Sequence, residues 1–303
     1  MRDCLVIGAG AAGLSAGLTL GRSRRTTLIV DLGQQSNLAA ATIGGLLGHD
    51  GRPPAEYYAA ARTELAAYPS VELSHGEISQ VGRQDDGTFA VTLADGRLEY
   101  ARTLLLAPGM DYRYPQVPGL SERWGADVFH CPFCHGWEVR DRPTAVLAEG
   151  AVGVHGALNL RAYTRDITLL TNGSELSATH RAQLASGGIK WDERPLARLT
   201  GEGSALRAVT FTDGADIAVS ALLVKAFLYQ RSELARDLGA TVTMTDEHLG
   251  VEAIVVDRMF RTGVPGLFAA GDAATSVPPS MAAAIASGYL AGASAAVQTT
   301  AGY

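Results

Sequence analysis

The sequence predicts an α/β protein with two dinucleotide-binding-type domains, the second inserted in the first. Short apolar segments alternate with helix-forming segments and glycine turns at the N-terminus, and the same alternation returns from Ala145 onward. This order is typical of βαβ units, which build parallel sheets. The length, 303 residues, also exceeds that of one core of ordinary size, so two domains are expected.

Composition restricts the partners. The chain is 47% hydrophobic, contains 35 glycines and carries a formal net charge of -6, with no basic cluster longer than Arg22–Arg25. We therefore expect a tightly turned fold and no nucleic-acid partner, since neutralising phosphates needs a basic face. The first apolar stretch is preceded by no basic segment, so we interpret it as a strand of a cytoplasmic protein. We find no apolar, uncharged run of about 18 residues and expect no membrane span.

The expected elements follow the hydrophobic pattern in chain order. In the first half we expect strands at Cys4–Ile7, Thr27–Val30, Val71–Leu73, Phe89–Leu93 and Arg102–Ala107, and helices at Ala12–Leu20 and Glu56–Tyr68. A proline-rich passage, Tyr114–Gly119, is a candidate domain boundary. Beyond it we expect strands at Ala145–Leu147 and Ile167–Leu170, helices at Val154–Tyr163 and Ala282–Val297, and a strand end with its loop within Gly263–Ala273.

The first glycine turn fits the pattern G-x-G-x-x-G between a strand and a helix. Gly8 permits the tight turn, Gly10 lets a pyrophosphate approach the backbone, and Gly13 allows the helix to contact the strand. The phosphate charge then lies at the helix N-terminus. Asp31 ends the next strand, where a carboxylate accepts a hydrogen bond from a ribose hydroxyl.

Two of the three cysteines form a C-x-x-C pair, Cys131 and Cys134. This spacing suits a redox disulfide, and a helix N-terminus near the second cysteine stabilises its thiolate. Zinc is the competing interpretation, but a closed zinc site needs four ligands and the chain has no second C-x-x-C pair. We therefore expect no metal. Cys4 lies among apolar residues and is expected to be a small buried side chain.

These features resemble the low-molecular-weight thioredoxin reductases. The glycine turn, the segment Ala107–Gly109 and the segment Thr262–Ala273 all match that family of flavoproteins. The resemblance implies FAD, with Gly271 and Asp272 contacting its ribityl chain and phosphates. It also implies an FAD-binding domain of residues 1–113 and 243–303, an inserted NAD(P)-binding-like domain of residues 114–242 that carries the dithiol, and a homodimer.

The same resemblance assigns roles to the dithiol. Cys134 should face the flavin and Cys131 should exchange with the substrate. The family places an Asp after the second cysteine as proton donor and acceptor, whereas this chain has His135. An imidazole titrates near neutrality and can take a thiol proton. A hydrogen-bonding role without proton transfer is the alternative for His135, and for His130 a structural role is favoured.

The chain departs from the family at the nicotinamide site. The second turn begins at Ala148 where the family has glycine, and Glu149 adds negative charge near the expected pyrophosphate position. The segment Thr171–Glu175, after the next strand, offers no arginine to a 2′-phosphate. We therefore expect poor binding of NADPH.

A segment of the form C-x-x-C-His-Gly-aromatic-Glu, together with loss of the nicotinamide site, resembles the dithiol oxidases of gliotoxin- and holomycin-type natural products. The resemblance implies oxidation of a small-molecule dithiol through Cys131/Cys134 and FAD, with O₂ as the acceptor and H₂O₂ as product. Two alternatives stay open: a thioredoxin-disulfide reductase that uses NAD(P)H or ferredoxin, and a flavin redox sensor or interaction protein.

Overall fold

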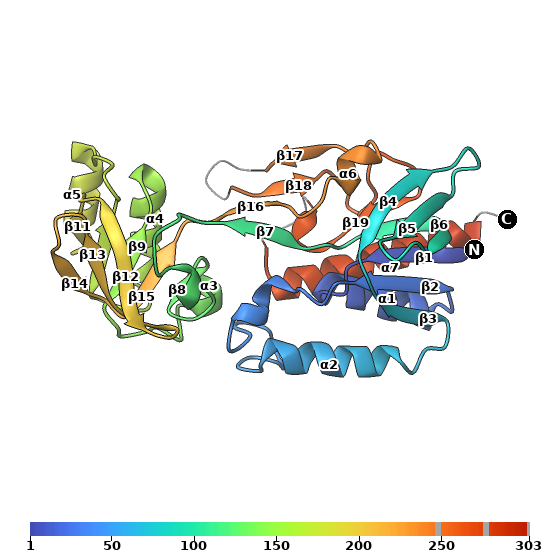
Figure 1. Ribbon diagram of the computed structural model, residues 1–303, viewed down its shortest axis with the longest axis horizontal. Coiled ribbons are helices and arrows are strands. Elements are labelled where there is room, and N and C mark those ends of the chain that lie inside the picture. The colour runs from blue at the N-terminus through green and yellow to red at the C-terminus, as the bar shows by residue number, and fades with distance from the viewer. Residues whose placement is uncertain (246–249, 275–278, 302–303) are drawn as a thin grey trace. The chain divides into compact units, whose positions relative to one another are not determined.

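The structure, a computed structural model, describes residues 1–245, 250–274 and 279–301 (Figure 1). The chain divides into two compact units. The first unit comprises Met1–Ser36, Pro54–Tyr112 and Leu228–Tyr303, and the second comprises Asn37–Pro53 and Arg113–Phe227.

These units refine the expected division into residues 1–113 plus 243–303 and residues 114–242. The return to the first unit begins at Leu228, and the segment Asn37–Pro53 groups with the second unit although it lies early in the sequence. Which unit binds which nucleotide stays a prediction. The short pair of strands β7 (Met110–Arg113) and β16 (Phe227–Gln230) lies where the chain passes between the units.

A seven-stranded sheet forms the centre of the first unit, in the order β3-β2-β1-β6-β5-β4, with β19 pairing with β6. Its parallel strands are β1 (Arg2–Ile7), β2 (Thr27–Asp31), β3 (Val71–His75), β6 (Leu98–Leu106) and β19 (Leu267–Ala269). The strands β5 (Phe89–Leu93) and β4 (Ile78–Arg83) continue it in antiparallel fashion. The buried, β-branched sequences of β1 and β2 explain their central place, and Cys4 is fully buried there, as expected.

The helices of this unit are α1 (Ala11–Arg22), α2 (Pro54–Leu65), the one-turn α6 (Leu234–Asp237) and α7 (Met281–Ala301). Helix α7 lies along α1 (Figure 1). Two glycines make this close approach possible, because a Cβ added at Gly288 would lie 2.1 Å from the Ala12 carbonyl oxygen and one at Gly292 would lie 2.8 Å from that of Ala16. The unit also contains the antiparallel pair β17 (Val242–Met244) and β18 (Glu252–Ile254).

Helix α7 bears on the expectation that no segment of the chain spans a membrane. The segment Met281–Thr300 is long and apolar enough to cross a membrane by length and composition alone, with 39% of its most apolar window buried. This run is not evident as an apolar stretch in the sequence, because serine, threonine and glycine interrupt it. Its packing on α1 is the packing of a core helix, so its composition is weak grounds for a membrane span.

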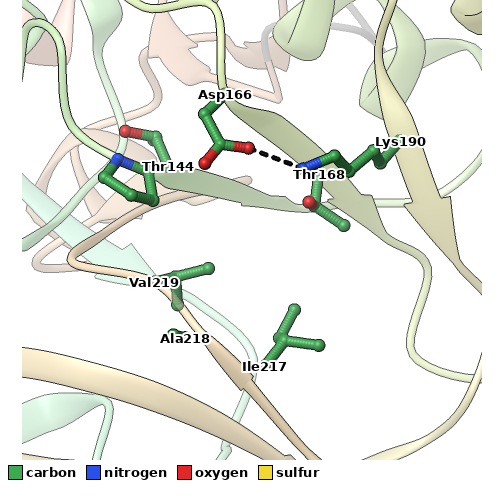
Figure 2. A pocket seen from close by; sticks show the side chains of 8 residues that line it. Thr144, Asp166, Thr168, Lys190, Ile217, Ala218 and Val219 are labelled. Atoms are coloured by element: carbon green, nitrogen blue, oxygen red, sulfur yellow. Dashed lines mark hydrogen bonds and ion pairs between the residues drawn. The ribbon is translucent and has the colours of Figure 1, made fainter.

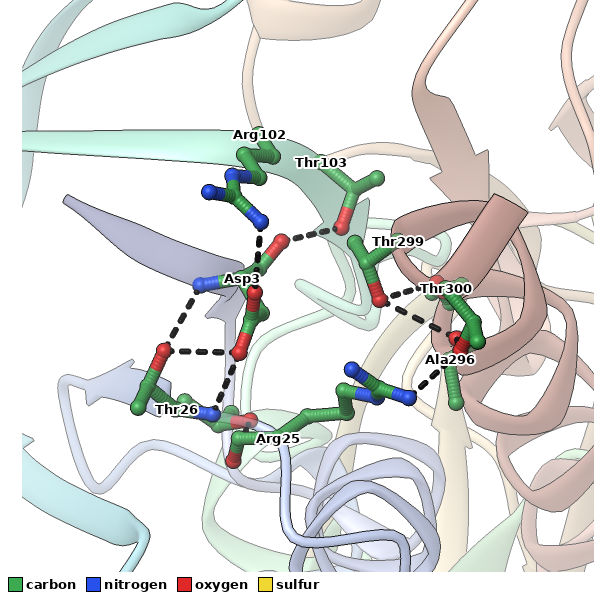
Figure 3. Close-up of polar contacts among 10 residues, drawn as sticks. Asp3, Arg25, Thr26, Arg102, Thr103, Ala296, Thr299 and Thr300 are labelled. Carbon is green, nitrogen blue, oxygen red and sulfur yellow. Dashed lines mark hydrogen bonds and ion pairs between the residues drawn. The ribbon is translucent and has the colours of Figure 1, made fainter. Parts of the chain in front are cut away.

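Polar contacts tie the amino ends of β1 and β2 to each other, to β6 and to the end of α7 (Figure 3). The Asp3 carboxylate accepts hydrogen bonds from the Thr26 backbone N–H and hydroxyl, each at 2.9 Å. The Thr103 hydroxyl donates to the Asp3 carbonyl at 2.8 Å, and Arg25 donates to the hydroxyl of Thr300. The amino ends of β1 and β2 are thereby occupied by structural contacts. The glycine turn lies at the opposite end, where β1 finishes.

A five-stranded parallel sheet of order β11-β10-β9-β15-β8 forms the centre of the second unit. Its strands are β8 (Val128–Phe129), β9 (Thr144–Leu147), β10 (Ile167–Leu170), β11 (Lys190–Asp192) and β15 (Ala221–Val224), and its helices are α3 (Pro132–His135), α4 (Gly150–Leu160) and α5 (Ala178–Ser186). An antiparallel sheet of β12 (Leu196–Glu202), β13 (Ala205–Phe211) and β14 (Asp216–Ala218) packs against it through one hydrophobic cluster. The 3₁₀ turns are η1 (Ser36–Ala39), η2 (Ser121–Arg123) and η3 (Gly271–Ala273).

Candidate active site

The dithiol lies at the carboxyl end of β8, where the chain turns into α3. Cys131 and Cys134 form a disulfide with a Cα–Cα distance of 5.4 Å. Cys131 is the N-cap of α3, and its Sγ accepts the backbone N–H of Cys134 at 3.2 Å. The helix therefore begins at Pro132, one residue after Cys131, and Cys134 lies within its first turn, close to the helix N-terminus.

Aromatic side chains surround the dithiol turn on its exposed and buried sides. The side chains of Phe133 and Trp137 are 79% and 65% exposed, and the Arg140 guanidinium lies 4.1 Å from the centre of the Trp137 ring system. On the buried side, a Cβ at Gly136 would lie 2.7 Å from the ring of Tyr163. The turn thus rests on one aromatic ring and presents two others to the solvent.

His135 is held as a neutral imidazole. Burial lowers its pKa and outweighs Glu138, a hydrogen bond to the Ala126 carbonyl and Asp127, which raise it. The ring also packs against Phe129, with the two ring centres 5.1 Å apart. A neutral imidazole has one donor and one acceptor nitrogen, and the bond to Ala126 uses the donor. The other nitrogen is then the one that can accept a proton.

His130, the residue before the dithiol, is also neutral. Burial lowers its pKa to about 4, and the positive charge of Lys225 adds to this effect. Its ring stacks on Trp124 at 5.6 Å, and Trp124 stacks on Tyr114 at 4.3 Å between ring centres. This stack gives His130 a packing role.

The first glycine turn forms a cradle whose three glycines have different surroundings. Gly8 has a φ of +100°, and a Cβ there would lie 2.2 Å from the Ala107 carbonyl oxygen, while one at Gly13 would lie 1.8 Å from that of Gly8. At Gly8 and Gly13, neighbouring backbone atoms of the protein leave no space for a side chain. Gly10 is different, because the nearest described atom to its Cβ position is Cγ of Gln35, 3.9 Å away. Gly10 is the N-cap of α1, so this loosely surrounded position lies at a helix N-terminus, where an anion is favoured.

The other predicted cofactor residues lie around this cradle. The Asp31 carboxylate accepts the Ala9 N–H at 3.0 Å and pairs with Arg62 at 2.8 Å. A Cβ at Gly271 would lie 3.0 Å from Cβ of Ala12, and burial raises the pKa of the neighbouring Asp272 to about 6. The structure therefore brings together the glycine turn, the acid at the end of β2 and the Gly271–Asp272 pair, all within the first unit. The partner Arg62 was not predicted, since nothing in its helical sequence distinguishes it.

The second turn, between β9 and α4, presents an acidic side chain at its helix N-terminus. Glu149 is the N-cap of α4, and among the described residues its exposed side chain makes no capping hydrogen bond. The loop after β10 adjoins Glu193, whose carboxylate accepts the N–H of Leu176 at 3.0 Å. Arg181, on α5, is already bonded to that carboxylate at 2.9 and 3.0 Å. Glu149 is thus an exposed carboxylate at the start of α4, and Arg181 is already paired with Glu193.

A pocket of about 160 Å³ lies in the second unit (Figure 2). The amino ends of β9, β10 and β11 line it, together with the end of β14 and Val219. Lys190 and Asp166, which pair at 2.9 Å, are among its lining residues. The dithiol follows the carboxyl end of β8 in the same parallel sheet, so this pocket is at the opposite edge. In the described part of the chain, no three His, Cys, Asp or Glu side chains are arranged to hold a metal ion.

A profile of the pyridine nucleotide-disulphide oxidoreductase family matches residues 2–288. The chain belongs to this family. It is therefore an oxidoreductase that acts on thiols and disulfides, and the family indicates a flavoprotein.

Relatives agree with this assignment over nearly the whole chain. Thioredoxin reductase tcpT of Claviceps purpurea is 30% identical over 309 residues, which cover 98% of this chain and 94% of tcpT. Thioredoxin reductase aclD of Aspergillus oryzae is 30% identical over 292 residues, covering 91% of this chain and 89% of aclD. The crystal structure of an oxidoreductase from Agrobacterium tumefaciens superposes with a TM-score of 0.91 at 35% identity, covering 100% of this chain and 99% of that one.

Proposed function

We propose that this protein is an FAD-dependent dithiol oxidase, which closes a disulfide in a small-molecule dithiol of the natural-product type. One observation carries the proposal. The C-x-x-C dithiol with its neutral histidine is accompanied by a second turn whose N-cap is Glu149, a poor site for the pyrophosphate of a nicotinamide nucleotide. A chain that cannot take electrons from NADPH is suited to take them from its thiol substrate.

The disulfide can oxidise a dithiol in two exchange steps. A substrate thiolate attacks Sγ of Cys131, forming a mixed disulfide, and Cys134 leaves as a thiolate. The second substrate thiol then attacks the substrate sulfur of the mixed disulfide, which closes the substrate disulfide and releases Cys131 as a thiolate. The N–H of Cys134 donates to Sγ of Cys131, so it stabilises this leaving charge.

His135 is assigned the proton transfers. Its lowered pKa keeps the imidazole neutral at neutral pH, ready to take a proton from a substrate thiol or a cysteine thiol. An Asp at this position would accept a proton less readily at neutral pH, because its usual pKa is about 4.

FAD is the proposed cofactor, held at Gly8, Gly10 and Gly13, with Asp31 at the adenosine end and the Gly271–Asp272 pair at the ribityl and phosphate groups. The absence of any close described neighbour at the Cβ position of Gly10 supports this placement of the pyrophosphate. When bound, FAD supplies a two-electron acceptor that couples oxidation of the dithiol to reduction of O₂ to H₂O₂. A homodimer and a cytoplasmic location complete the proposal.

A thioredoxin-disulfide reductase is the second candidate, because relatives such as tcpT and aclD are named thioredoxin reductases. This function needs a reductant that enters without the NADPH contacts missing here, for example NADH or ferredoxin.

Aerobic turnover separates the two candidates. The flavin-loaded protein, incubated in air with a small aromatic dithiol and no nicotinamide, is expected to consume thiols and form about one H₂O₂ per disulfide. Mass spectrometry follows the disulfide and a peroxidase-coupled assay follows H₂O₂, with heat-denatured protein plus free FAD as control. Consumption of thiols no faster than in the control contradicts the oxidase function.

A further inference from the structure

The segment Asn37–Pro53 contains a loop that is closed on itself by hydrogen bonds. The Ile43 N–H donates to the Arg52 carbonyl at 2.9 Å, and the Gly51 N–H returns to the Ile43 carbonyl at 2.8 Å. The Gly45 N–H donates to the Asp50 carboxylate at 2.8 Å. These bonds give the loop a defined shape, although it has no helix or strand beyond η1.

The loop contacts the backbone of the dithiol turn at Gly44. A Cβ added at Gly44 would lie 2.0 Å from the carbonyl oxygen of Cys134 and 3.5 Å from its Cα. Real Cβ atoms are essentially never closer than 3.0 Å to such a neighbour, so any side chain here forces a shift of about 1 Å. The Cα–Cβ bond is about 1.5 Å, which puts Cα of Gly44 at most about 3.5 Å from this oxygen, the range of a Cα–H···O contact.

Gly44 is glycine for reasons of space and not of backbone conformation. Its φ is not positive, whereas Gly45 and Gly48 in the same loop have φ of +73° and +84° and no described atom within 4 Å of their Cβ positions. A neighbouring backbone atom therefore excludes a side chain at Gly44, whereas backbone conformation favours glycine at positions 45 and 48. Of these three glycines, Gly44 is the one whose Cβ position meets the dithiol turn.

A second contact ties the same segment to the approach to the dithiol. A Cβ at Gly125 would lie 2.6 Å from the carbonyl carbon of Ala39. Gly125 precedes β8, whose end carries Cys131, and its N–H donates to the Val128 carbonyl at 2.9 Å. The segment thus lies against the backbone on both sides of the β8–α3 connection.

We propose that Gly44 is a positioning residue for the dithiol. Its backbone lies on the Cys134 carbonyl and sets the place of the one-turn helix α3, and with it the place of the Cys134 sulfur. The inference rests on the proposed function only in taking Cys131/Cys134 as the working dithiol. A displacement near 1 Å at a reacting group commonly costs about 10²-fold in rate, so this contact is expected to matter for turnover.

The test compares Gly44→Ala with the matched control Gly48→Ala in the flavin-loaded protein. Gly44→Ala introduces the clash without backbone strain, and Gly48→Ala introduces backbone strain without the clash. Equilibration with mixtures of reduced and oxidised dithiothreitol measures the potential of the Cys131/Cys134 couple, and alkylation of the reduced protein measures the reactivity of its thiols. Both measurements are independent of the electron acceptor, so they test Gly44 even if the oxidase function is wrong.

For Gly44→Ala we expect at least a tenfold change in both the exchange equilibrium with dithiothreitol and the turnover, with FAD content retained. For Gly48→Ala we expect both within twofold of wild type. Equal values for Gly44→Ala and wild type overturn the proposal. If Gly44→Ala does not fold, hydrogen exchange of the wild-type protein replaces it. Amides of residues 43–45 should change protection when the disulfide is reduced, and unchanged protection overturns the proposal.

Discussion

Lowering the pH from 8 to 5 is expected to destabilise the fold through His130, the residue that precedes the dithiol. Its pKa is about 4 in the folded protein, chiefly because it is buried, against a usual value of 6.5. Between these two values the unfolded chain binds a proton that the folded chain does not. Stability rises with pH wherever the unfolded state binds more protons, so it is lost as the pH falls below 6.5.

The size of the loss follows from the two pKa values. At pH 5 an unfolded chain with a pKa of 6.5 is almost fully protonated at this residue, while a folded chain with a pKa of about 4 is mostly neutral. The difference in proton binding corresponds to about 2 kcal/mol at pH 5, as an upper limit. His135 shifts in the same direction and adds to the total loss.

The variant His130→Phe isolates the contribution of His130, because it keeps a ring for the stack on Trp124 and removes the titrating group. Urea unfolding at pH 8 and pH 5, followed by circular dichroism and by tryptophan fluorescence, gives the free energy of unfolding of both proteins. The wild type should lose about 2 kcal/mol more than the variant between the two pH values. Equal losses in both proteins would refute the reasoning, and so would an NMR titration of His130 near pH 6.5.

Further outcomes follow from the proposed mechanism. Cys131→Ser and Cys134→Ser should each abolish dithiol turnover in the peroxide assay while keeping the FAD content, and only the protein that retains Cys134 should show a long-wavelength charge-transfer band; activity in either variant removes the dithiol from the mechanism. His135→Ala should slow turnover by about 10²-fold and His135→Asp should restore part of it, whereas wild-type rates in both leave the imidazole a structural role. Denaturation should release FAD into the supernatant, and a protein that stays colourless when incubated with FAD contradicts the proposed cofactor.

The parts of the fold that the sequence predicted are those with a local cause. The glycine turn and the buried runs of β1 and β2 were identified because their patterns fall within a few residues. Phe89–Leu93 alternates buried and partly buried positions, and the predicted strand has the bounds of β5. By contrast β4, with the sequence ISQVGR, has no fully buried residue, and the hydrophobic pattern did not reveal it.

The parts that were missed depend on contacts between distant segments. Nothing in the sequence near Gly44 indicates that its Cβ position meets the carbonyl of Cys134, far along the chain. The same holds for the pairing of Asp31 with Arg62 and for the bond between His135 and Ala126. The N-cap position of Cys131 was not predicted either, since C-x-x-C spacing gives the two cysteines but not the residue at which the helix begins.

The direction of electron flow is tested most directly by anaerobic stopped-flow mixing of the flavin-loaded protein with NADPH and, separately, with a small dithiol. The second turn offers Glu149 at its helix N-cap, and Arg181 is held by Glu193. We therefore expect NADPH to lack, among the described residues of this turn, charged partners that are commonly worth about 1.5–3 kcal/mol each. The proposed function predicts bleaching of the flavin by the dithiol and no bleaching by sub-millimolar NADPH within seconds. Rapid bleaching by NADPH would contradict the proposal and identify a reductase.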